Sequence, residues 1–512
     1  MENTIRVRFA PSPTGPLHIG GVRTALYNYL FARKNGGKMI LRIEDTDQTR
    51  FVEGAEDYII KSLSWAGIEF DEGVHLGGPY APYRQSERAH IYKKYIEKLI
   101  ENKSVYYAFD TAEELEKIRT DYQNRKLTFQ YDASTRLQMK NSLTMSEEET
   151  DKLLKSGQSY VIRFLLPENQ HITVKDLIRG EVTVNTSQLD DKVLFKSDGL
   201  PTYHLANVVD DHLMKITHVI RGEEWLPSAP LHVLLYQSFG WEATMPVFAH
   251  LPLLLKPEGN GKLSKRDGDR LGFPVFPLQW LDPKTKEISS GYKETGYFSE
   301  AFINMLALLG WNPGIEQEIF TMDELIQHFS VERINKSGAK FAPEKARWFN
   351  QQYLRNIPDE TLVEMFKDIL KEKNIEGGDN ILFDVIHLVK ERVAFVNEIW
   401  NEAQFFFERP KVIDEQSVKK RCNEKTIGIL ENITKLLERI TVWKGVHIHT
   451  VLHKFIEDNT MNAGQVMLPL RLSLVGALKG PDIADIVYIL GKDECIDRIK
   501  AAKECINGIL KK

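Results

Sequence analysis

RFAPSPTGPLHIGGVRTALYNYL, residues 8–30, links an alternating apolar stretch to a stretch with helical spacing. Residues 5–10 alternate as a strand does, whereas residues 21–35 carry apolar side chains every three or four positions. The turn between them is rich in proline and glycine. Nucleotide sites of open α/β sheets lie at such strand-to-helix turns. The stretch therefore predicts the first strand–turn–helix unit of a parallel sheet.

The alternation of strand and helix continues outward from this unit. Gly36 and Gly37 supply a helix stop, and the order of elements is typical of a parallel sheet with right-handed crossovers. The pattern breaks over roughly residues 85–195 and then returns. We therefore predict a doubly wound α/β domain that is split by an insertion. Its further elements are a strand over 38–44, a helix over 52–67, a strand over 216–222, a helix over 226–239 and a strand over 246–255.

The second half of the chain differs from the first. Strand patterns fade beyond about residue 320, and charged helical segments follow. We expect helices over 359–373, 380–400 and 482–511. Residues 258–296 are rich in Gly, Pro, Lys and Asp, so we expect little regular structure there.

The composition is that of a soluble protein with several domains. The chain has 512 residues, of which 42% are hydrophobic and 27% are charged. It has no apolar run of about 18 residues and no secretory signal, so we expect no membrane span. The three cysteines, Cys422, Cys495 and Cys505, are sparse, which favours reduced thiols and a cytoplasmic location. A net charge of −5 neither indicates nor excludes a nucleic-acid partner.

The turn at residues 11–21 is the first candidate for chemistry. Gly20 and Gly21 have no side chains, so a flat base could approach the start of the predicted helix closely. The N-terminus of that helix would favour a phosphate, and His18 could donate a hydrogen bond to a phosphate oxygen. The alternative is a Pro/Gly turn with one surface histidine.

The second candidate is Gly-Lys-Leu-Ser-Lys-Arg, residues 261–266. Three cations and a hydroxyl on a loop flanked by glycine suit a mobile clamp on a polyphosphate. The alternative is a solvated basic loop. The two candidates lie at opposite ends of one split domain, and this pairing favours the functional interpretation.

Together the two segments resemble the HIGH and KMSKS signatures of class I aminoacyl-tRNA synthetases. Longer matches narrow the resemblance to the bacterial glutamyl-tRNA synthetases, and they cover almost the whole chain. These matches are LRIEDTD (41–47), PYRQSER (82–88), DGLPTYHLANVVDDHLMKITHVIRGEEWL (198–226), FINMLALLGWNP (302–313), KFAPEKARWFNQQYLR (340–355) and PLRLSLVG (469–476).

The resemblance implies a domain organisation. We expect an α/β Rossmann-type catalytic domain with an inserted α+β domain that binds the acceptor end of tRNA, followed by all-α C-terminal domains. The expected order is the first Rossmann half (1–84), the insertion (85–195), the second Rossmann half (196–255), the KMSKS-type loop with a stem-contact domain (256–329), and two helical anticodon-binding parts (330–400 and 401–512).

The resemblance also assigns roles to residues. The expected reaction uses ATP with Mg²⁺ to activate L-glutamate and transfers it to tRNA-Glu. An acidic amino acid calls for arginines, and Arg8 and Arg221 end two strands at the same sheet edge. Alternatively, Arg8 is a solvated strand end, and Glu44 caps a helix or forms a salt bridge. The expected catalytic residues are His18, Lys262 and Lys265; those binding ATP are Pro11, Gly20, Gly21, Lys262, Leu263, Ser264, Lys265 and Arg266; those binding glutamate are Arg8, Ala10, Ser12, Glu44, Tyr203, Asn207 and Arg221.

The chain departs from the family pattern in several places. Gly21 replaces the last histidine of the first signature, and Leu263 and Arg266 replace two residues of the second, which are common changes. The segment 106–110, comparable to the zinc site of some members, has no cysteine, so we expect no metal site and no zinc. Residues 270–295 are longer than the usual connection, and we interpret them as an inert surface insertion.

Contacts with RNA are expected in the insertion and in the C-terminal helices. In the insertion, basic and aromatic residues could contact phosphates or stack on bases, and the C-terminal helices should read the anticodon. A monomer is expected. The candidates in the insertion are Tyr106, Arg125, Lys126, Arg136 and Arg163.

Three other functions are less consistent with the sequence. A glutaminyl-tRNA synthetase usually has Pro-Glu-Pro-Asn-Gly where this chain has Pro-Ser-Pro-Thr-Gly (11–15), and its C-terminal half is β-barrel rather than helical. A short glutamyl-queuosine type of enzyme would lack the anticodon domains. A catalytically silent RNA-binding relative would not need His18, Lys262 and Lys265. Whether tRNA-Gln is also charged stays open.

Overall fold

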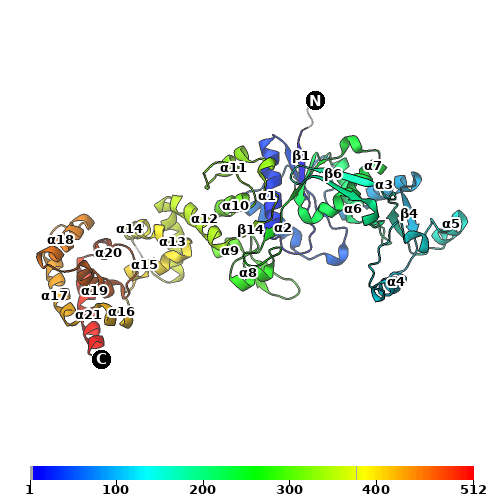
Figure 1. Cartoon of the computed structure of the whole chain (residues 1–512). Coiled ribbons are helices and arrows are strands. Elements are labelled where there is room, and N and C mark those ends of the chain that lie inside the picture. Colours follow the sequence, from blue (N-terminus) through cyan, green and yellow to red (C-terminus); the bar gives the residue numbers. More distant parts are fainter. Residues whose placement is uncertain (1–3, 376–377, 512) are drawn as a thin grey trace. The chain divides into compact units, whose positions relative to one another are not determined.

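The computed structural model describes residues 4–375 and 378–511. The chain divides into two compact units after Ala346. The first unit contains sheets and helices, and the described residues from 347 onward contain helices only (Figure 1).

The central sheet of the first unit brings together strands from both sides of the insertion. β1 (Arg6–Phe9), β2 (Lys38–Leu41) and β3 (Glu72–Gly73) are parallel and lie in that order. β1 also lies beside β9, where Thr217 N donates to Arg6 O at 2.9 Å. The other half has the order β7-β6-β10-β9, formed by β6 (His171–Asp176), β7 (Gly180–Asn185), β9 (His218–Gly222) and β10 (Val247–Leu251).

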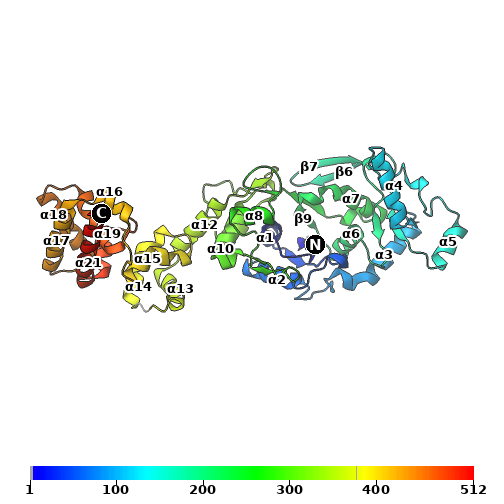
Figure 2. The ribbon, with the colours of Figure 1, turned by 90° about the horizontal axis from the view of Figure 1, so that it is seen from below.

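Helices connect and cover these strands. α1 (Ile19–Lys34) packs against β1, β2 and β9, as the opening stretch predicts. A close approach fixes its end, because a Cβ on Gly37 would lie 2.5 Å from the Ile5 carbonyl oxygen. On the sheet half seen at the right of Figure 2, α6 packs against α7, and α7 against β6. The other helices are α2 (Ala55–Trp65), α6 (Tyr203–Leu213), α7 (Ala229–Ser238), α10 (Ser299–Leu308) and α11 (Met322–His328).

The expected insertion contributes to two sheets. One is its own antiparallel sheet, with the order β4-β5-β8. The β6–β7 hairpin also comes from this range, but β6 pairs with β10 of the central sheet through Asp176 and Phe248. The elements between the Rossmann halves are α3 (Ala89–Glu101), β4 (Val105–Ala108), α4 (Ala112–Asn124), α5 (Glu147–Lys155), β5 (Val161–Phe164) and β8 (Val193–Phe195).

The segment 258–296 is more ordered than its composition predicts. Trp280 is buried with its ring 5.1 Å from that of Tyr58, and Ile19 N donates to Val275 O at 2.9 Å. The segment 270–295 is therefore anchored by the ring of Trp280 on α2 and by the backbone of Val275 at the start of α1. Its interpretation as an inert insertion stays a prediction. Its elements are α8 (Lys265–Leu271), β12 (Trp280–Leu281), β13 (Ile288–Ser289) and α9 (Tyr292–Thr295).

Two strand expectations need correction. The predicted strand over 246–255 is two strands, β10 and β11 (Leu254–Leu255), which belong to different sheets. β11 pairs with β14 (Ala339–Lys340), so a short strand exists beyond residue 320. Pairing with a distant segment, which local patterns do not reveal, creates it.

The second unit shows two interrupted helices. The predicted helix 380–400 breaks where Glu398 accepts from Ala394 N at 2.9 Å, and the helix 482–511 breaks at Gly491, whose φ is +82°. The helices are α13 (Asp359–Glu372), α14 (Asp379–Val389), α15 (Ile399–Phe407), α16 (Glu415–Arg421), α17 (Glu424–Arg439), α18 (Gly445–Asp458), α19 (Ala463–Val475), α20 (Ile483–Leu490) and α21 (Lys492–Leu510); α12 (Pro343–Asn356) spans the division between the units.

A buried ion pair joins the start of the insertion to the central helices. Asp210 on α6 is fully buried and accepts from Arg88 Nε at 2.8 Å and from Tyr92 Oη at 2.7 Å. Removing one partner of such a pair leaves an uncompensated charge in a region of low dielectric constant.

We expect Arg88→Met to lower the free energy of unfolding of the first unit by roughly 3–5 kcal/mol. Urea unfolding followed by tryptophan fluorescence measures this. The matched control is Arg125→Met, whose 3.7 Å ion pair with Asp121 is solvent-exposed and contributes little. Equal shifts in the two variants would contradict the expectation.

Candidate functional site

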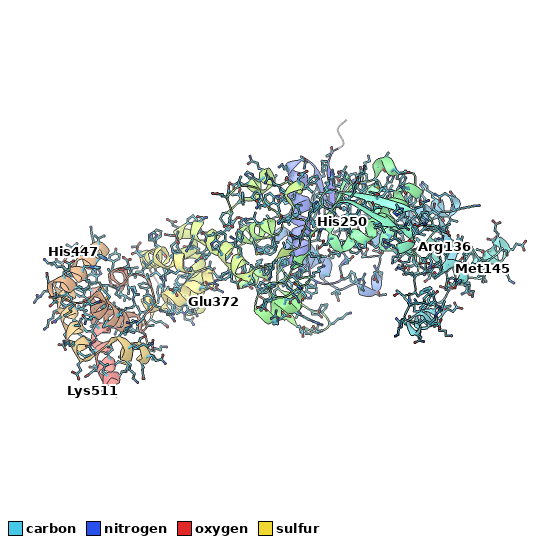
Figure 3. The ribbon with its side chains drawn as sticks, viewed as in Figure 1. Arg136, Met145, His250, Glu372, His447 and Lys511 are labelled. Carbon is cyan, nitrogen blue, oxygen red and sulfur yellow. The ribbon has the colours of Figure 1, made fainter. Side chains whose placement is uncertain are left out.

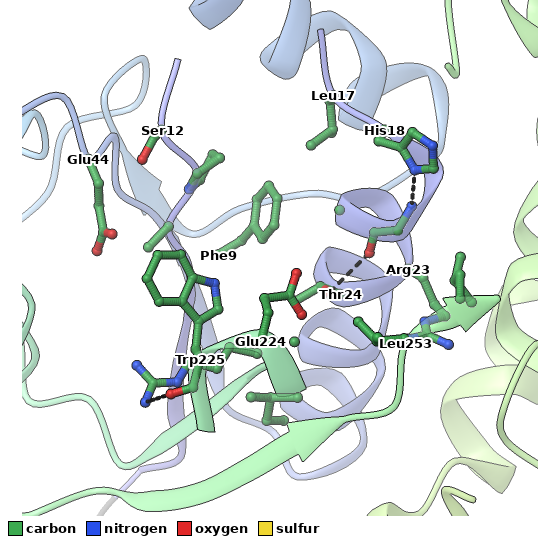
Figure 4. A pocket seen from close by; sticks show the side chains of 18 of the residues that line it. Phe9, Ser12, Leu17, His18, Arg23, Thr24, Glu44, Glu224, Trp225 and Leu253 are labelled. Atoms are coloured by element: carbon green, nitrogen blue, oxygen red, sulfur yellow. Dashed lines mark hydrogen bonds between the residues drawn. The ribbon is translucent and has the colours of Figure 1, made fainter. Parts of the chain in front are cut away.

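A pocket of about 480 Å³ opens at the carboxyl ends of β1 and β9. Figure 4 shows Ser12 and Glu44 on one side of it and His18 on the other. All seven residues expected to bind glutamate line it, together with His18, Pro11, Gly20, Gly21, Lys262 and Leu263. Ser264, Lys265 and Arg266 do not line it.

His18 caps the N-terminus of α1. Its Nδ1 accepts a hydrogen bond from Gly20 N at 3.2 Å, so the ring proton of the neutral form is on Nε2. Nε2 is buried without a hydrogen-bond partner among the described residues. Burial, with a smaller contribution from the charge of Lys262, lowers the pKa of His18 to about 4. At neutral pH His18 therefore offers one uncharged N–H donor beside a helix N-terminus.

Two buried arginines lie at the sheet edge of the pocket. Arg221 is 5% exposed; its NH1 donates to Tyr203 Oη at 2.7 Å and its Nε to His250 Nε2 at 3.0 Å. Arg8 is 3% exposed, and its Nε donates to Asp211 at 3.1 Å. The interpretation of Arg8 as a solvated strand end is therefore excluded. Buried guanidinium groups in a pocket wall suit a carboxylate ligand.

Glu44 adds a negative charge to the same pocket. Its Oε1 accepts from Arg42 at 3.0 Å and from Asn207 Nδ2 at 2.9 Å. Burial raises the pKa of Glu44, although Arg42 and Arg8 favour its ionised form. Cations and a carboxylate in one cavity suit a ligand that carries both charges.

The basic segment 261–266 lies at the rim of the pocket. Lys262 forms a 2.8 Å ion pair with Glu224, and Lys265 lies 3.7 Å from a carboxylate oxygen of Glu287. All four side chains are exposed. Ser264 caps α8 through Asp267, so its hydroxyl is used within the loop.

The sequence did not single out several lining residues. The ring of Trp225 lies against that of Tyr203, tilted by 34° with centroids 4.4 Å apart, and the Trp225 carbonyl accepts from Arg221 NH2 at 3.3 Å. Glu224 precedes it and pairs with Lys262. Both follow β9 directly, and this position at the carboxyl edge of the sheet was the available signal.

The residues of the insertion that were expected to contact RNA differ in burial. Tyr106 and Arg136 are buried and both contact Asp191, with the Tyr106 hydroxyl at 2.8 Å and Arg136 NH1 at 3.1 Å from its Oδ2. They stabilise the core of the insertion, so surface contact by them is excluded. Arg163 is half-buried over the ring of Tyr131. Arg125 and Lys126 are exposed and stay candidates.

Across 4–375 and 378–511, no group of three or more His, Cys, Asp or Glu residues could hold a metal ion. In the same residues, no helix is long and apolar enough to span a bilayer. The expectation of no zinc stays a prediction.

Known proteins share this organisation. The family described as "tRNA synthetases class I (E and Q), catalytic domain" matches residues 4–348, and the family "Anticodon binding domain" matches residues 344–503. A glutamate–tRNA ligase of Porphyromonas gingivalis is 58% identical over 99% of this chain and 100% of the relative. The chain belongs to the glutamyl-tRNA synthetase family.

Further relatives agree across the whole length. The glutamate–tRNA ligase of Bacteroides fragilis is 57% identical over 99% of both chains. The crystal structure of a glutamate tRNA ligase from Elizabethkingia meningosepticum, in complex with its amino acid, superimposes with a TM-score of 0.94 at 52% identity, covering 98% of this chain and 100% of that one. Membership of the glutamyl-tRNA synthetases therefore extends from the catalytic domain to the helical C-terminal unit.

We expect the His18 ring to titrate in this synthetase with a midpoint near pH 4 rather than 6.5, because burial disfavours the imidazolium. A folded pKa below the unfolded one stabilises the fold above about pH 6.5, and that contribution is lost as the pH falls toward 4. NMR of ¹⁵N-histidine-labelled protein measures the midpoint, with His18→Gln assigning the signal. A midpoint at or above 6.5 would contradict the buried environment.

Proposed function

We propose that the chain activates L-glutamate with ATP and transfers it to the 3′-terminal adenosine of tRNA-Glu, and that the residues of the pocket bind glutamate and ATP. The observation that supports these roles most strongly is the combination of buried arginines and Glu44 with a helix N-terminus in one cavity. That combination matches the charges of glutamate at one end and those of a phosphate at the other.

Glutamate lies at the sheet edge in this proposal. Its side-chain carboxylate contacts Arg8, Arg221 and the Tyr203 hydroxyl. Its α-ammonium group pairs with Glu44, where a cation would favour the ionised carboxylate against the effect of burial. The main-chain end of the substrate contacts Ala10, Ser12 and Asn207.

ATP lies over the start of α1. Pro11, Gly20 and Gly21 form a surface without long side chains, so the nucleotide can approach the backbone closely. His18 Nε2–H donates to a phosphate oxygen. The loop residues Lys262, Leu263, Ser264, Lys265 and Arg266 close over the polyphosphate when the loop moves. Gly259 and Gly261, with φ of +71° and +113°, precede them in the chain.

The first step joins an oxygen of the glutamate α-carboxylate to the α-phosphorus of ATP and releases pyrophosphate. Negative charge grows on the phosphoryl oxygens in the transition state. His18, Lys262 and Lys265 stabilise that charge, and positioning of the two substrates supplies the rest. Mg²⁺ accompanies the ATP and is held mainly by phosphates and water.

In the second step a hydroxyl of the terminal adenosine attacks the activated carbonyl carbon. An ester bond forms, AMP leaves, and the hydroxyl proton passes to solvent or phosphate. Residues 85–195 are proposed to present the acceptor end, 256–329 to contact the stem, and 330–400 with 401–512 to read the anticodon. A monomer suffices for this arrangement.

Aminoacylation with purified tRNA-Glu and tRNA-Gln, offered glutamate and glutamine separately, tests the function. We expect glutamyl-tRNA-Glu as the main product and negligible use of glutamine. The tRNA-Gln arm distinguishes a discriminating enzyme from one that charges both tRNAs. Preferential use of glutamine would overturn the proposal.

Lys265→Ala should slow glutamyl-adenylate formation by about a hundred- to a thousandfold, because one charge-stabilising contact in the transition state is lost. ATP–pyrophosphate exchange measures the rate. Affinity for tRNA should change little. Lys284→Ala is the control and should behave as the parent, because Lys284 is exposed and lies three residues before Glu287, the partner of Lys265. Near-normal exchange in Lys265→Ala would remove this residue from the mechanism.

Arg221→Ala should lose far more kcat/KM for glutamate than for glutamine. A guanidinium group only donates, so it suits a carboxylate and meets a like donor in the amide of glutamine. Exchange assays with both amino acids give the ratio. An equal loss for the two substrates would mean that selection depends on another residue, with Arg8 the next to test.

A further inference from the structure

Three polar side chains stand in a buried row behind the pocket. Asp176 ends β6, His250 lies on β10, and Arg221 lies on β9. His250 Nδ1 lies 2.6 Å from Asp176 Oδ2, and Arg221 Nε donates to His250 Nε2 at 3.0 Å. His250 is completely buried within the central sheet, where Figure 3 labels it.

The hydrogen bonds define the state of the histidine. A guanidinium group has donors only, so Nε2 of His250 must accept. The ring proton is then on Nδ1 and is donated to Asp176. Burial, with the nearby charge of Arg221, lowers the pKa of His250, which agrees with a neutral ring.

The carboxylate of Asp176 is itself fixed in orientation. Its Oδ1 accepts from the backbone amides of Ile178 and Arg179 at 2.9 and 2.8 Å, and from His250 N at 3.3 Å. Only Oδ2 faces the histidine ring. Burial favours the protonated acid, but the hydrogen bonds with His250 and these amides keep the pKa of Asp176 below its usual value.

The row leaves Arg221 with two donors for a ligand. Of the five N–H groups of a guanidinium, Nε uses His250, NH1 uses Tyr203 and NH2 uses Trp225 O. One N–H group therefore stays available on each of the terminal nitrogens NH1 and NH2. Two such donors match the two oxygens of a carboxylate.

We propose that Asp176 and His250 are positioning residues that set the selectivity for glutamate by holding the guanidinium of Arg221 in one orientation. Asp176 fixes the tautomer of His250, and His250 presents the single acceptor that Arg221 Nε requires. The inference rests on the proposed contact between Arg221 and the glutamate side chain.

Asp176→Asn separates this role from simple packing. The three backbone amides require the amide oxygen of the asparagine at the Oδ1 position, so its NH₂ group faces His250 Nδ1. Nδ1 must then accept, and the ring proton moves to Nε2. Two donors, His250 Nε2–H and Arg221 Nε–H, would meet, and Arg221 would turn away from its position.

The experiment is a double-mutant cycle with His250→Gln in the full chain. A glutamine can present its amide oxygen to Arg221 Nε whatever occupies position 176. We expect Asp176→Asn to raise the KM for glutamate by about tenfold or more in the parent, through the unsatisfied donor, with a nearly unchanged KM for ATP. In the His250→Gln background the same change should have a much smaller effect.

One further variant, compared with His250→Gln, keeps the test decisive if Asp176→Asn folds poorly, which thermal unfolding reports. His250→Phe keeps a ring but has no acceptor, so it should raise the KM for glutamate far more than His250→Gln does. If His250→Phe and His250→Gln raise the KM equally, Asp176 and His250 contribute only packing. The same conclusion follows if Asp176→Asn has equal effects with histidine and with glutamine at position 250. If Arg221→Ala leaves the KM for glutamate unchanged, the proposed contact of Arg221 fails instead.

Discussion

The catalytic unit depends on the neutralisation of buried arginines by two neighbouring aspartates of α6. Asp210 accepts from Arg88, and Asp211 lies 3.1 Å from Arg8 and 2.8 Å from Arg42. Successive residues of a helix point about 100° apart, so one turn can serve two groups of cations. Without these carboxylates, the desolvation cost of the arginines would exclude them from the sheet edge. The pocket and the root of the insertion are therefore held by the same helical turn.

The two ends of the pocket differ in rigidity. At the proposed amino-acid end, Arg8 and Arg221 are buried and each has a fixed protein partner. At the proposed phosphate end, Lys262 and the neighbouring Lys265 are exposed and pair with Glu224 and Glu287, and exposed pairs of this kind are broken at little cost. A rigid end suits discrimination between similar side chains, whereas an adjustable end suits a polyphosphate whose charge distribution changes during the reaction.

Local patterns predicted the first unit well because its strand–turn–helix signals are strong, as in residues 8–30. Long motifs indicated the lining residues of the pocket, but burial could not be read from them: Tyr106 and Arg136 resembled RNA contacts and proved to be core residues. Failures occurred where distant contacts decide the structure. Trp280 packs on α2 and anchors a segment whose composition predicted little regular structure. His250 contacts Asp176 and Arg221 only because β6, β9 and β10 are neighbours in space. Spacing along the chain does not encode such neighbours.

The pairing of β6 with β10 has a consequence for recombination between relatives. In sequence, residues 85–195 resemble an inserted domain that could be exchanged as one segment. However, residues 171–185 form the β6–β7 hairpin on the central sheet, and this hairpin contains Asp176. A chimera with crossovers at both ends of that range would exchange strands of the central sheet together with the β4-β5-β8 sheet. A chimera can instead keep the β6–β7 hairpin of the recipient protein. The β4-β5-β8 sheet of the donor protein is then transferred intact only as two segments, one before β6 and one after β7. The β6–β7 hairpin, which belongs to the central sheet, therefore divides the sequence of the β4-β5-β8 sheet. Exchange of this sheet between synthetases requires two separate grafts.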